Sequence, residues 1–408
     1  MFKNLIKRPL LSLAVASLFT ASSVQAADAP PIKIGGIYLM SGSAATYGQF
    51  ADQGAQLAIK EINASGGVLG RKLAIQIEDG QGKAAVAIQA ARKLVYQDKV
   101  DFLMGLDSSG VALGLVPTVP ALDRVFMLTH AATPDATGKL CNASTYRISV
   151  NVNQNMKGAA KIAAKTGVKK WTTIGPDYAF GHQTWEYFSK YLKELSPDVQ
   201  IMTETAFPRF GAEDFTPFIN GVMANKPDGV MISLWGGDLV NFVRQATNRG
   251  FFKQGYQLLF PVGAATEVLT ALGEQMPEGL WLGTRYWYDA YDNDINKKFV
   301  ASYKKDFGVP PSYNAEGAYA AVYAFKTAIE KAGKTDTASV RAALSGMSFE
   351  APNGTVTFRK GDNQALVGPT WGLTGAMNAK DKIRSLTQLN VFTGADVTPS
   401  VQETGCKL

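Results

Sequence analysis

The feature that most constrains the fold is a regular alternation of strand-like and helix-like segments. In the first third of the chain, short apolar runs of strand length are separated by longer segments with helical periodicity. We expect strands at 32–40, 73–78, 101–105 and 125–129, and helices at 49–62, 84–96 and 111–122. This alternation is typical of right-handed βαβ units, which place their strands in a parallel sheet.

A second series of the same kind begins near residue 146. We expect helices at 154–165, 183–195, 215–224 and 239–249, and strands at 171–175, 200–206, 229–234 and 257–261. A chain of 408 residues exceeds the usual size of a single core. The two series therefore predict an α/β protein with two doubly wound, Rossmann-like lobes.

The last third of the chain departs from this simple pattern. It contains a strand-like run at 280–286, helical patterns at 294–306, 315–332 and 337–344, and short strands at 355–359, 371–374 and 386–391. Both lobes need these elements for completion, so the chain is expected to cross between them more than once. We assign 31–147 plus 286–346 to an N-terminal lobe and 148–283 plus 353–400 to a C-terminal lobe, joined by a multi-crossover hinge.

The first residues have the pattern of an export signal. Lys3, Lys7 and Arg8 precede a short apolar run at 10–19, and Val24-Gln25-Ala26 is a small-x-small cleavage sequence. The apolar run is too short to span a bilayer comfortably, which disfavours a membrane anchor. We therefore predict a signal peptide over 1–26 and a periplasmic mature protein.

Charge and metal-binding residue types exclude some functions. The formal net charge of +7 comes from scattered basic residues, which gives no footprint for nucleic-acid binding. The chain has only two histidines and two cysteines, too few for the usual zinc sites. In an oxidising compartment, the isolated pair Cys141 and Cys406 is expected to form a disulfide rather than a metal site. We predict no cofactor.

Three turns that follow predicted strands are rich in small and hydroxyl-bearing residues. They are Ser41 to Gly48, which includes Tyr47, then Asp107-Ser108-Ser109-Gly110, and Ala131-Ala132-Thr133-Pro134. Open α/β sheets bind ligands at such strand ends, and the N terminus of a following helix offers N–H groups to an anion. These turns therefore predict a ligand-binding crevice.

The order of the motifs resembles the branched-chain amino-acid-binding periplasmic proteins, which have the type I periplasmic binding-protein fold. The matching segments are Leu39-Met40-Ser41-Gly42, Tyr47-Gly48, Gly54 to Ala58, Ile62 to Leu73, Ala131 to Pro134, Phe180-Gly181, Trp235-Gly236-Gly237 and Arg244-Gln245-Ala246. The resemblance implies a monomeric, non-enzymatic solute receptor that closes like a Venus flytrap and delivers its cargo to an ABC permease.

The resemblance also implies roles for individual residues. Tyr47 would line the pocket, Ser108 and Thr133 would hold a ligand carboxylate, and backbone groups near Ala131 and Ala132 would assist. The second lobe would contribute apolar walls. The complete set of candidate ligand-binding residues is Tyr47, Asp107, Ser108, Ser109, His130, Ala131, Ala132, Thr133, Phe180, Trp235, Val262 and Tyr286.

One departure from the family bears on the ligand. Amino-acid binders of this family carry an acidic residue after the last central strand of the second lobe, where it pairs with the ammonium group. Here 260–265 contain no acid, and the first one is Glu267. An unpaired ammonium in a closed cleft would be costly. We therefore favour a carboxylate without an amine, such as an aromatic acid. Asp107 or Asp238 could replace the missing acid, so a branched-chain amino acid remains an alternative.

A secreted enzyme or a sensor component with the same fold is a more distant alternative. Ser108 and Ser109 could act as nucleophiles, but the chain lacks a G-x-S-x-G motif and a convincing His/Asp partner. An enzyme should place a coupled nucleophile–base pair or a metal in the cleft. The sequence therefore favours a binding protein.

Overall fold

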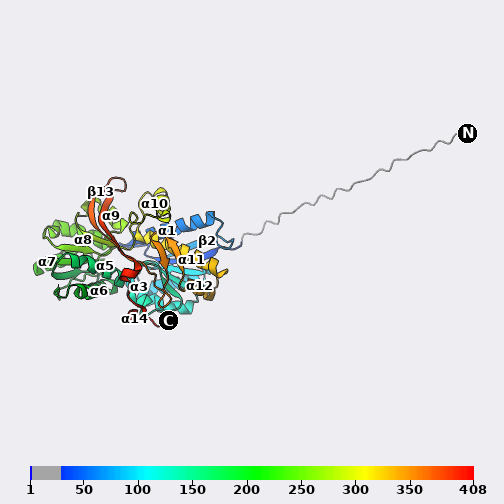
Figure 1. Cartoon of the computed structure of the whole chain (residues 1–408), viewed down its shortest axis with the longest axis horizontal. Helices are drawn as coiled ribbons and strands as arrows, with labels where there is room; N and C mark the ends of the chain where they lie inside the picture. The colour runs from blue at the N-terminus through cyan, green and yellow to red at the C-terminus, as the bar shows by residue number, and fades with distance from the viewer. Residues whose placement is uncertain (2–28) are drawn as a thin grey trace.

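The structure is a computed structural model that describes Met1 and residues 29–408. Residues 2–26 of the predicted signal peptide lie outside the described residues. Figure 1 shows two lobes side by side, each with a central sheet flanked by helices. The described residues contain no helix with the length and apolar character needed to cross a membrane.

The N-terminal lobe is built on a five-stranded, fully parallel sheet. Its strand order is β2-β1-β3-β4-β5, so β2 lies on one side of β1 and the later strands are added on the other side. The strands are β1 (Ile32–Tyr38), β2 (Leu73–Asp79), β3 (Phe102–Gly105), β4 (Val125–Leu128) and β5 (Thr145–Arg147). The helices are α1 (Ala45–Ala64), α2 (Ala84–Tyr96), α3 (Ser109–Leu115), α4 (Val119–Leu122) and, from later in the chain, α10 (Asp294–Phe307), α11 (Tyr313–Ala332) and α12 (Thr337–Leu344). Helix α11 packs along α1, so the late helices complete this lobe.

The C-terminal lobe is built on a seven-stranded sheet in the order β14-β13-β10-β9-β8-β6-β7. The first five strands along the chain are parallel, and β13 and β14 add an antiparallel edge. The strands are β6 (Lys170–Ile174), β7 (Gln200–Ile201), β8 (Gly229–Ile232), β9 (Gln257–Phe260), β10 (Trp281–Thr284), β13 (Thr370–Asn378) and β14 (Ile383–Val391). The helices are α5 (Val152–Lys165), α6 (Ala179–Leu195), α7 (Thr216–Asn225), α8 (Gly236–Asn248) and α9 (Thr266–Leu272). A separate hairpin joins β11 (Ser348–Ala351) to β12 (Gly354–Thr357).

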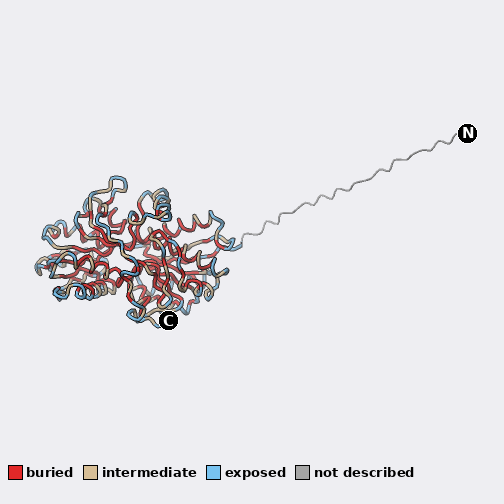
Figure 2. Tube along the Cα trace, in the orientation of Figure 1, coloured by how far each residue is buried: buried red, intermediate tan, exposed pale blue. Residues whose placement is uncertain are grey.

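Both lobes therefore have the doubly wound α/β architecture that the alternating pattern predicts. The parallel sheet of the N-terminal lobe separates two hydrophobic cores, one with α1 and α11 and the other with α2 and α3, which explains why β3 and β4 are buried along their whole length. Figure 2 shows buried chain through the centre of both lobes and exposed chain around their outer edges.

Element boundaries differ from the prediction where local chemistry intervenes. The helix expected at 111–122 is divided into α3, a short 3-10 turn and α4, because Pro117 and Pro120 each lack the N–H that a continuous helix needs. The strand expected at 200–206 is reduced to two residues at the sheet edge. Helix α11 begins two residues earlier than expected, because Ser312 caps it and accepts the Asn314 backbone N–H at 3.1 Å.

The connections between the lobes lie against one another. The first crossover follows β5, and the third follows β12. They are joined by hydrogen bonds from the Arg147 N–H to the Asn363 carbonyl (3.0 Å) and from the Ala365 N–H to the Arg147 carbonyl (2.8 Å). The second crossover follows β10 and leads to α10. This pairing ties separate crossovers into one hinge region.

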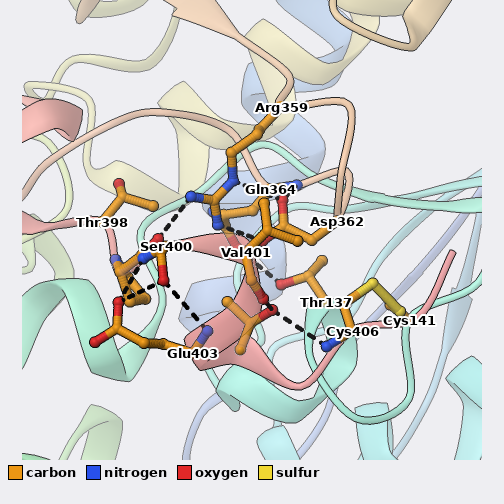
Figure 3. Close-up of polar contacts among 12 residues, drawn as sticks. Thr137, Cys141, Arg359, Asp362, Gln364, Thr398, Ser400, Val401, Glu403 and Cys406 are labelled. Carbon is orange, nitrogen blue, oxygen red and sulfur yellow. Dashed lines mark hydrogen bonds and ion pairs between the residues drawn. A yellow bond between two sulfur atoms is a disulfide. The ribbon is translucent and has the colours of Figure 1, made fainter.

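The C-terminal tail returns from the second lobe to the first. After α13 (Gly394–Val397) the tail forms α14 (Val401–Thr404) and ends in a disulfide that joins Cys406 to Cys141 (Figure 3). Arg359 binds the chain just before α14, because its guanidinium pairs with Asp362 and donates to the Pro399 carbonyl at 2.6 Å. The tail is therefore a further covalently fastened link across the hinge region.

Candidate ligand site between the lobes

A small cavity lies where the strand ends of the two sheets face each other. Its free volume is about 20 Å³, room for little more than one water molecule, so an organic ligand requires the lobes or the lining side chains to move apart. It is lined by Tyr47, Asp107, Ser109, His130, Ala132, Tyr178, Phe180, Trp235, Val262, Arg285, Tyr313 and Asn314. Most lining residues follow β1, β3 and β4 in the first lobe and β6, β8, β9 and β10 in the second, at the carboxyl ends of the strands. Tyr313 and Asn314 come from the start of α11.

Aromatic side chains form most of the apolar wall. Tyr47 meets Trp235 edge-on, with ring centroids 5.1 Å apart, and meets Tyr313 in the same way at 6.0 Å. The Trp235 indole N–H donates to the Tyr178 hydroxyl at 2.9 Å. Burial raises the pKa of the Tyr47 phenol well above its usual value, so this hydroxyl stays protonated. The cavity is therefore shaped by rigid rings that come from both lobes.

Arg285 brings a positive charge into this aromatic cavity. It follows directly after β10 and is only 8% exposed. One guanidinium nitrogen, Nη1, donates to the His130 carbonyl, and the guanidinium carbon lies 4.9 Å from the centre of the Tyr313 ring. The other guanidinium N–H groups have no acceptor among the described residues. A planar cation with donors to spare is well suited to a carboxylate.

His130 and Asp107 lie side by side on the first lobe. The His130 Nε2 lies 2.8 Å from the Asn314 carbonyl, which can only accept, so Nε2 carries a hydrogen. The Nδ1 atom lies 3.3 Å from Asp107 Oδ1 and 3.1 Å from the Thr129 hydroxyl. The other Asp107 oxygen, Oδ2, accepts the Leu39 N–H at 2.7 Å. The Asp107 carboxylate is therefore engaged within the first lobe, and Arg285 brings a cationic side chain to the cavity lining.

The two lobes touch beside the cavity. The Gly237 N–H donates to the Ser43 carbonyl at 3.1 Å, and the Gly236 N–H donates to the Tyr47 hydroxyl at 3.3 Å. A Cβ atom on Gly237 would lie only 2.7 Å from the Ser43 carbonyl oxygen and 2.9 Å from the Ser43 Cβ. The lobes can approach this closely only because position 237 has no side chain.

Most of the residues that the sequence nominated meet in this cavity. Tyr47, Asp107, Ser109, His130, Ala132, Phe180, Trp235 and Val262 all line it. The structure places the other four nominated residues outside the lining. Ser108 lies in a neighbouring hollow with Tyr38 and Val111, and Ala131 is buried in the core of the first lobe.

Thr133 and Tyr286 are buried in contacts with other protein groups and do not line the cavity. The Thr133 carbonyl accepts a hydrogen bond of 2.6 Å from the buried Arg147 guanidinium, and its side chain is fully buried. Tyr286 stacks on Tyr291 with ring centroids 5.6 Å apart, and its hydroxyl donates to Asn296. We expected the acid group to be held by hydroxyl and backbone donors alone. The structure differs in presenting a guanidinium to the cavity.

Sequence reasoning missed Tyr178, Arg285, Tyr313 and Asn314. Two of them could have been predicted from the sequence, because ligand sites lie at the ends of strands. Tyr178 follows the strand predicted at 171–175, and Arg285 lies in the last residues of the strand predicted at 280–286. Tyr313 and Asn314 reach the cavity from the first turn of α11, which follows the second crossover. Sequence patterns do not show where such a crossover meets the cleft.

The described residues contain no cluster of three or more histidine, cysteine, aspartate or glutamate side chains that could hold a metal ion. The chemistry that this part of the chain offers is the recognition of a small anion by a cation, neutral polar groups and aromatic walls.

Comparison with known proteins identifies the family of the chain. A family model described as periplasmic binding protein matches residues 31–373. A leucine-, isoleucine-, valine-, threonine- and alanine-binding protein of Pseudomonas aeruginosa is 28% identical over 368 residues, which cover 88% of this chain and 92% of that protein.

Two solved structures are similar over most of the chain. The substrate-binding protein of an amino-acid ABC transporter from Pseudomonas fluorescens Pf-5 has a TM-score of 0.81 and 27% identity, covering 93% of this chain and 100% of that one. A solute-binding protein of an ABC transporter from Rhodopseudomonas palustris BisB5, in complex with 3,4-dihydroxybenzoic acid, has a TM-score of 0.79 and 26% identity, covering 89% and 97%. The chain therefore belongs to the periplasmic binding protein family, as an ABC-type solute-binding protein with the type I fold of the branched-chain amino-acid-binding group.

Proposed function

We propose that this protein is the periplasmic receptor of an ABC importer and that it captures a small aromatic carboxylate in the interlobe cavity. The observation that carries the proposal is Arg285, whose guanidinium lies among aromatic walls with donors unused by the described residues. A carboxylate at this position would receive charge-assisted hydrogen bonds, each worth about 1.5–3 kcal/mol. The ring of the ligand would pack against the aromatic side chains of both lobes.

The charge balance of the cavity supports an acid without an amine. Asp107 accepts the Leu39 N–H and faces the His130 ring, so its carboxylate is already engaged within the first lobe and is a weak partner for an ammonium group. Glu267 is outside the cavity lining, and burial raises its pKa to about 7 against the smaller opposing effect of hydrogen bonds from Asn314 and Ser312. The R. palustris relative in complex with 3,4-dihydroxybenzoic acid adds support from a similar fold.

Capture would proceed by hinge closure. The ligand meets one lobe, the other lobe swings over it, and contacts made only in the closed form shift the balance toward closure. The hydrogen bonds between Gly237 and Ser43 and between Gly236 and Tyr47 belong to this closed form. The closed monomer would then present its surface to the membrane subunits of an ABC permease and release the ligand chemically unchanged.

An amino acid is the second candidate, because Asp107 lines the cavity and because the P. aeruginosa relative is described as binding amino acids. Isothermal titration calorimetry separates the two. The purified mature protein should bind benzoate or a hydroxybenzoate, and chromatography should recover the ligand unaltered. Binding of leucine, isoleucine or valine with no response to the aromatic acids would overturn the aromatic-acid proposal, and conversion of the ligand would contradict the receptor role.

A further inference from the structure

Asn314 has an unusual position in the cavity lining. Its side chain is fully buried, it lines the interlobe cavity, and its Oδ1 atom has no hydrogen-bond partner among the described residues. Buried polar atoms in native proteins are nearly always paired, so an unpaired acceptor that lines a ligand cavity calls for a donor. The only other cavity-lining side-chain atom of this kind among the described residues is Asp107 Oδ1, which lies 3.3 Å from His130 Nδ1.

The orientation of the Asn314 amide is set by its neighbours. Its Nδ2 donates to Glu267 Oε1 at 2.8 Å, and the same oxygen accepts the Ser312 hydroxyl at 2.7 Å. Turning the amide over would place its oxygen against the Glu267 oxygen, where no hydrogen bond is possible while that oxygen accepts. The Oδ1 atom is therefore held as the free acceptor, and Glu267 holds it there.

The donor that this acceptor needs cannot be the carboxylate of the ligand. An ionised carboxylate only accepts, and Arg285 is the group that suits it. A second group on the ligand must donate. A neutral amide oxygen brings no charge to balance a buried ammonium, so it suits a neutral hydroxyl better. The two demands together describe an aromatic acid that also carries a hydroxyl group.

We infer that Asn314 is a specificity-determining residue that accepts a hydrogen bond from a ring hydroxyl of the ligand, and that Glu267 is the residue that positions it. The inference rests on the proposed function, since it takes the carboxylate to be held by Arg285. It adds the requirement that the substrate is a hydroxylated aromatic acid. An unsubstituted acid would leave the Asn314 oxygen unpaired in the closed cavity.

The test compares ligands that differ only at the donor. Calorimetry on the wild-type protein would measure Kd for benzoate, 4-fluorobenzoate, and 3- and 4-hydroxybenzoate. At least one hydroxybenzoate should bind about tenfold or more tighter than benzoate and 4-fluorobenzoate, because a site built to pair with a hydroxyl discriminates strongly against analogues that lack it. This arm needs no variant, so it does not depend on whether a substitution folds.

The variants then assign the effect to a residue. Asn314→Leu keeps the size of the side chain and removes the acceptor, so the hydroxybenzoate preference should fall to about one while benzoate affinity changes less than about threefold. Glu267→Gln should reduce the preference in part, because its amide no longer fixes the Asn314 orientation. The matched control is Asn153→Leu, another buried asparagine whose Oδ1 already accepts the Tyr191 hydroxyl and which is outside the cavity lining, and it should keep the wild-type preference.

Each outcome has a distinct meaning. Equal affinities for benzoate and the hydroxybenzoates in the wild-type protein would overturn the inference and leave the proposed function standing. A preference that survives in Asn314→Leu would also overturn it. Binding of amino acids alone would overturn the proposed function and the inference together.

Discussion

Replacing Arg285 by methionine tests the electrostatic part of the site. Methionine keeps an unbranched chain that can pack on Tyr313 but removes every donor. A bidentate carboxylate would lose two charge-assisted hydrogen bonds, and about 1.5 kcal/mol for each gives about 3 kcal/mol, or about a 150-fold rise in Kd. The lower end of the range applies because the carboxylate gives up its hydration on binding. Isothermal titration calorimetry with benzoate and 4-hydroxybenzoate measures this change directly.

Two controls separate the charge from a general loss of structure. Benzamide is neutral and can accept from the guanidinium only through its carbonyl oxygen, so its affinity should fall by about tenfold in Arg285→Met, well below the loss for benzoate. Arg244→Met on α8 removes a guanidinium that bonds to Gln275 and the Ala271 carbonyl outside the cavity lining, and it should leave benzoate affinity unchanged. If Arg285→Met binds benzoate as tightly as the wild type while its thermal unfolding is unaltered, Arg285 does not hold the acid group.

Three further outcomes are expected. Gly237→Val should block closure, because its side chain would collide with Ser43. Ligand affinity should fall by about tenfold or more, and small-angle scattering should no longer report compaction on ligand addition. The control Gly221→Ala, with no atoms near its added Cβ, should behave as wild type. Removing the Cys141–Cys406 disulfide by a double serine substitution should lower the free energy of unfolding by up to about 4–5 kcal/mol, measured by denaturant titration, since it closes a long loop; no loss would show that the tail does not constrain the unfolded chain. Burial raises the pKa of Glu316 to about 8 from 4.5, so between these values the folded state keeps a proton that the unfolded state has lost. The free energy of unfolding should therefore fall by up to about 1.4 kcal/mol per pH unit as pH rises from about 5 to 8, relative to a Glu316→Gln variant. Parallel stability–pH curves for the two proteins would refute the shift.

The fold could be predicted from the sequence because its signals are local. Alternating strand and helix patterns predict parallel sheets, and a strand that ends in a small-residue turn places that turn at the carboxyl edge of the sheet. For this reason Tyr47, Asp107, His130 and Trp235 were nominated and do line one cavity. Boundaries were less accurate where single residues act, as at Pro117, which helps to divide a predicted helix.

The rest of the site depends on long-range geometry. Thr133 was nominated by analogy, yet the buried guanidinium of Arg147 binds its carbonyl, and its side chain is outside the cavity lining. Arg285 reaches the cavity because the chain leaves β10 at this point to cross between lobes. Asn314 depends on the meeting of the start of α11 with α9 of the second lobe, where Asn314 donates to Glu267. Such positions follow from how crossovers pack, which no local pattern encodes.

The central claim is that Arg285 holds the acid group of an aromatic ligand between the two lobes. A crystal structure of the protein with bound 4-hydroxybenzoate tests it most directly. We predict the carboxylate within hydrogen-bond distance of the Arg285 guanidinium and the ring packed against Tyr47 and Trp235. A ligand whose carboxylate contacts only the turn at Ala131 to Thr133, or a ligand bound outside the cavity, would contradict the account.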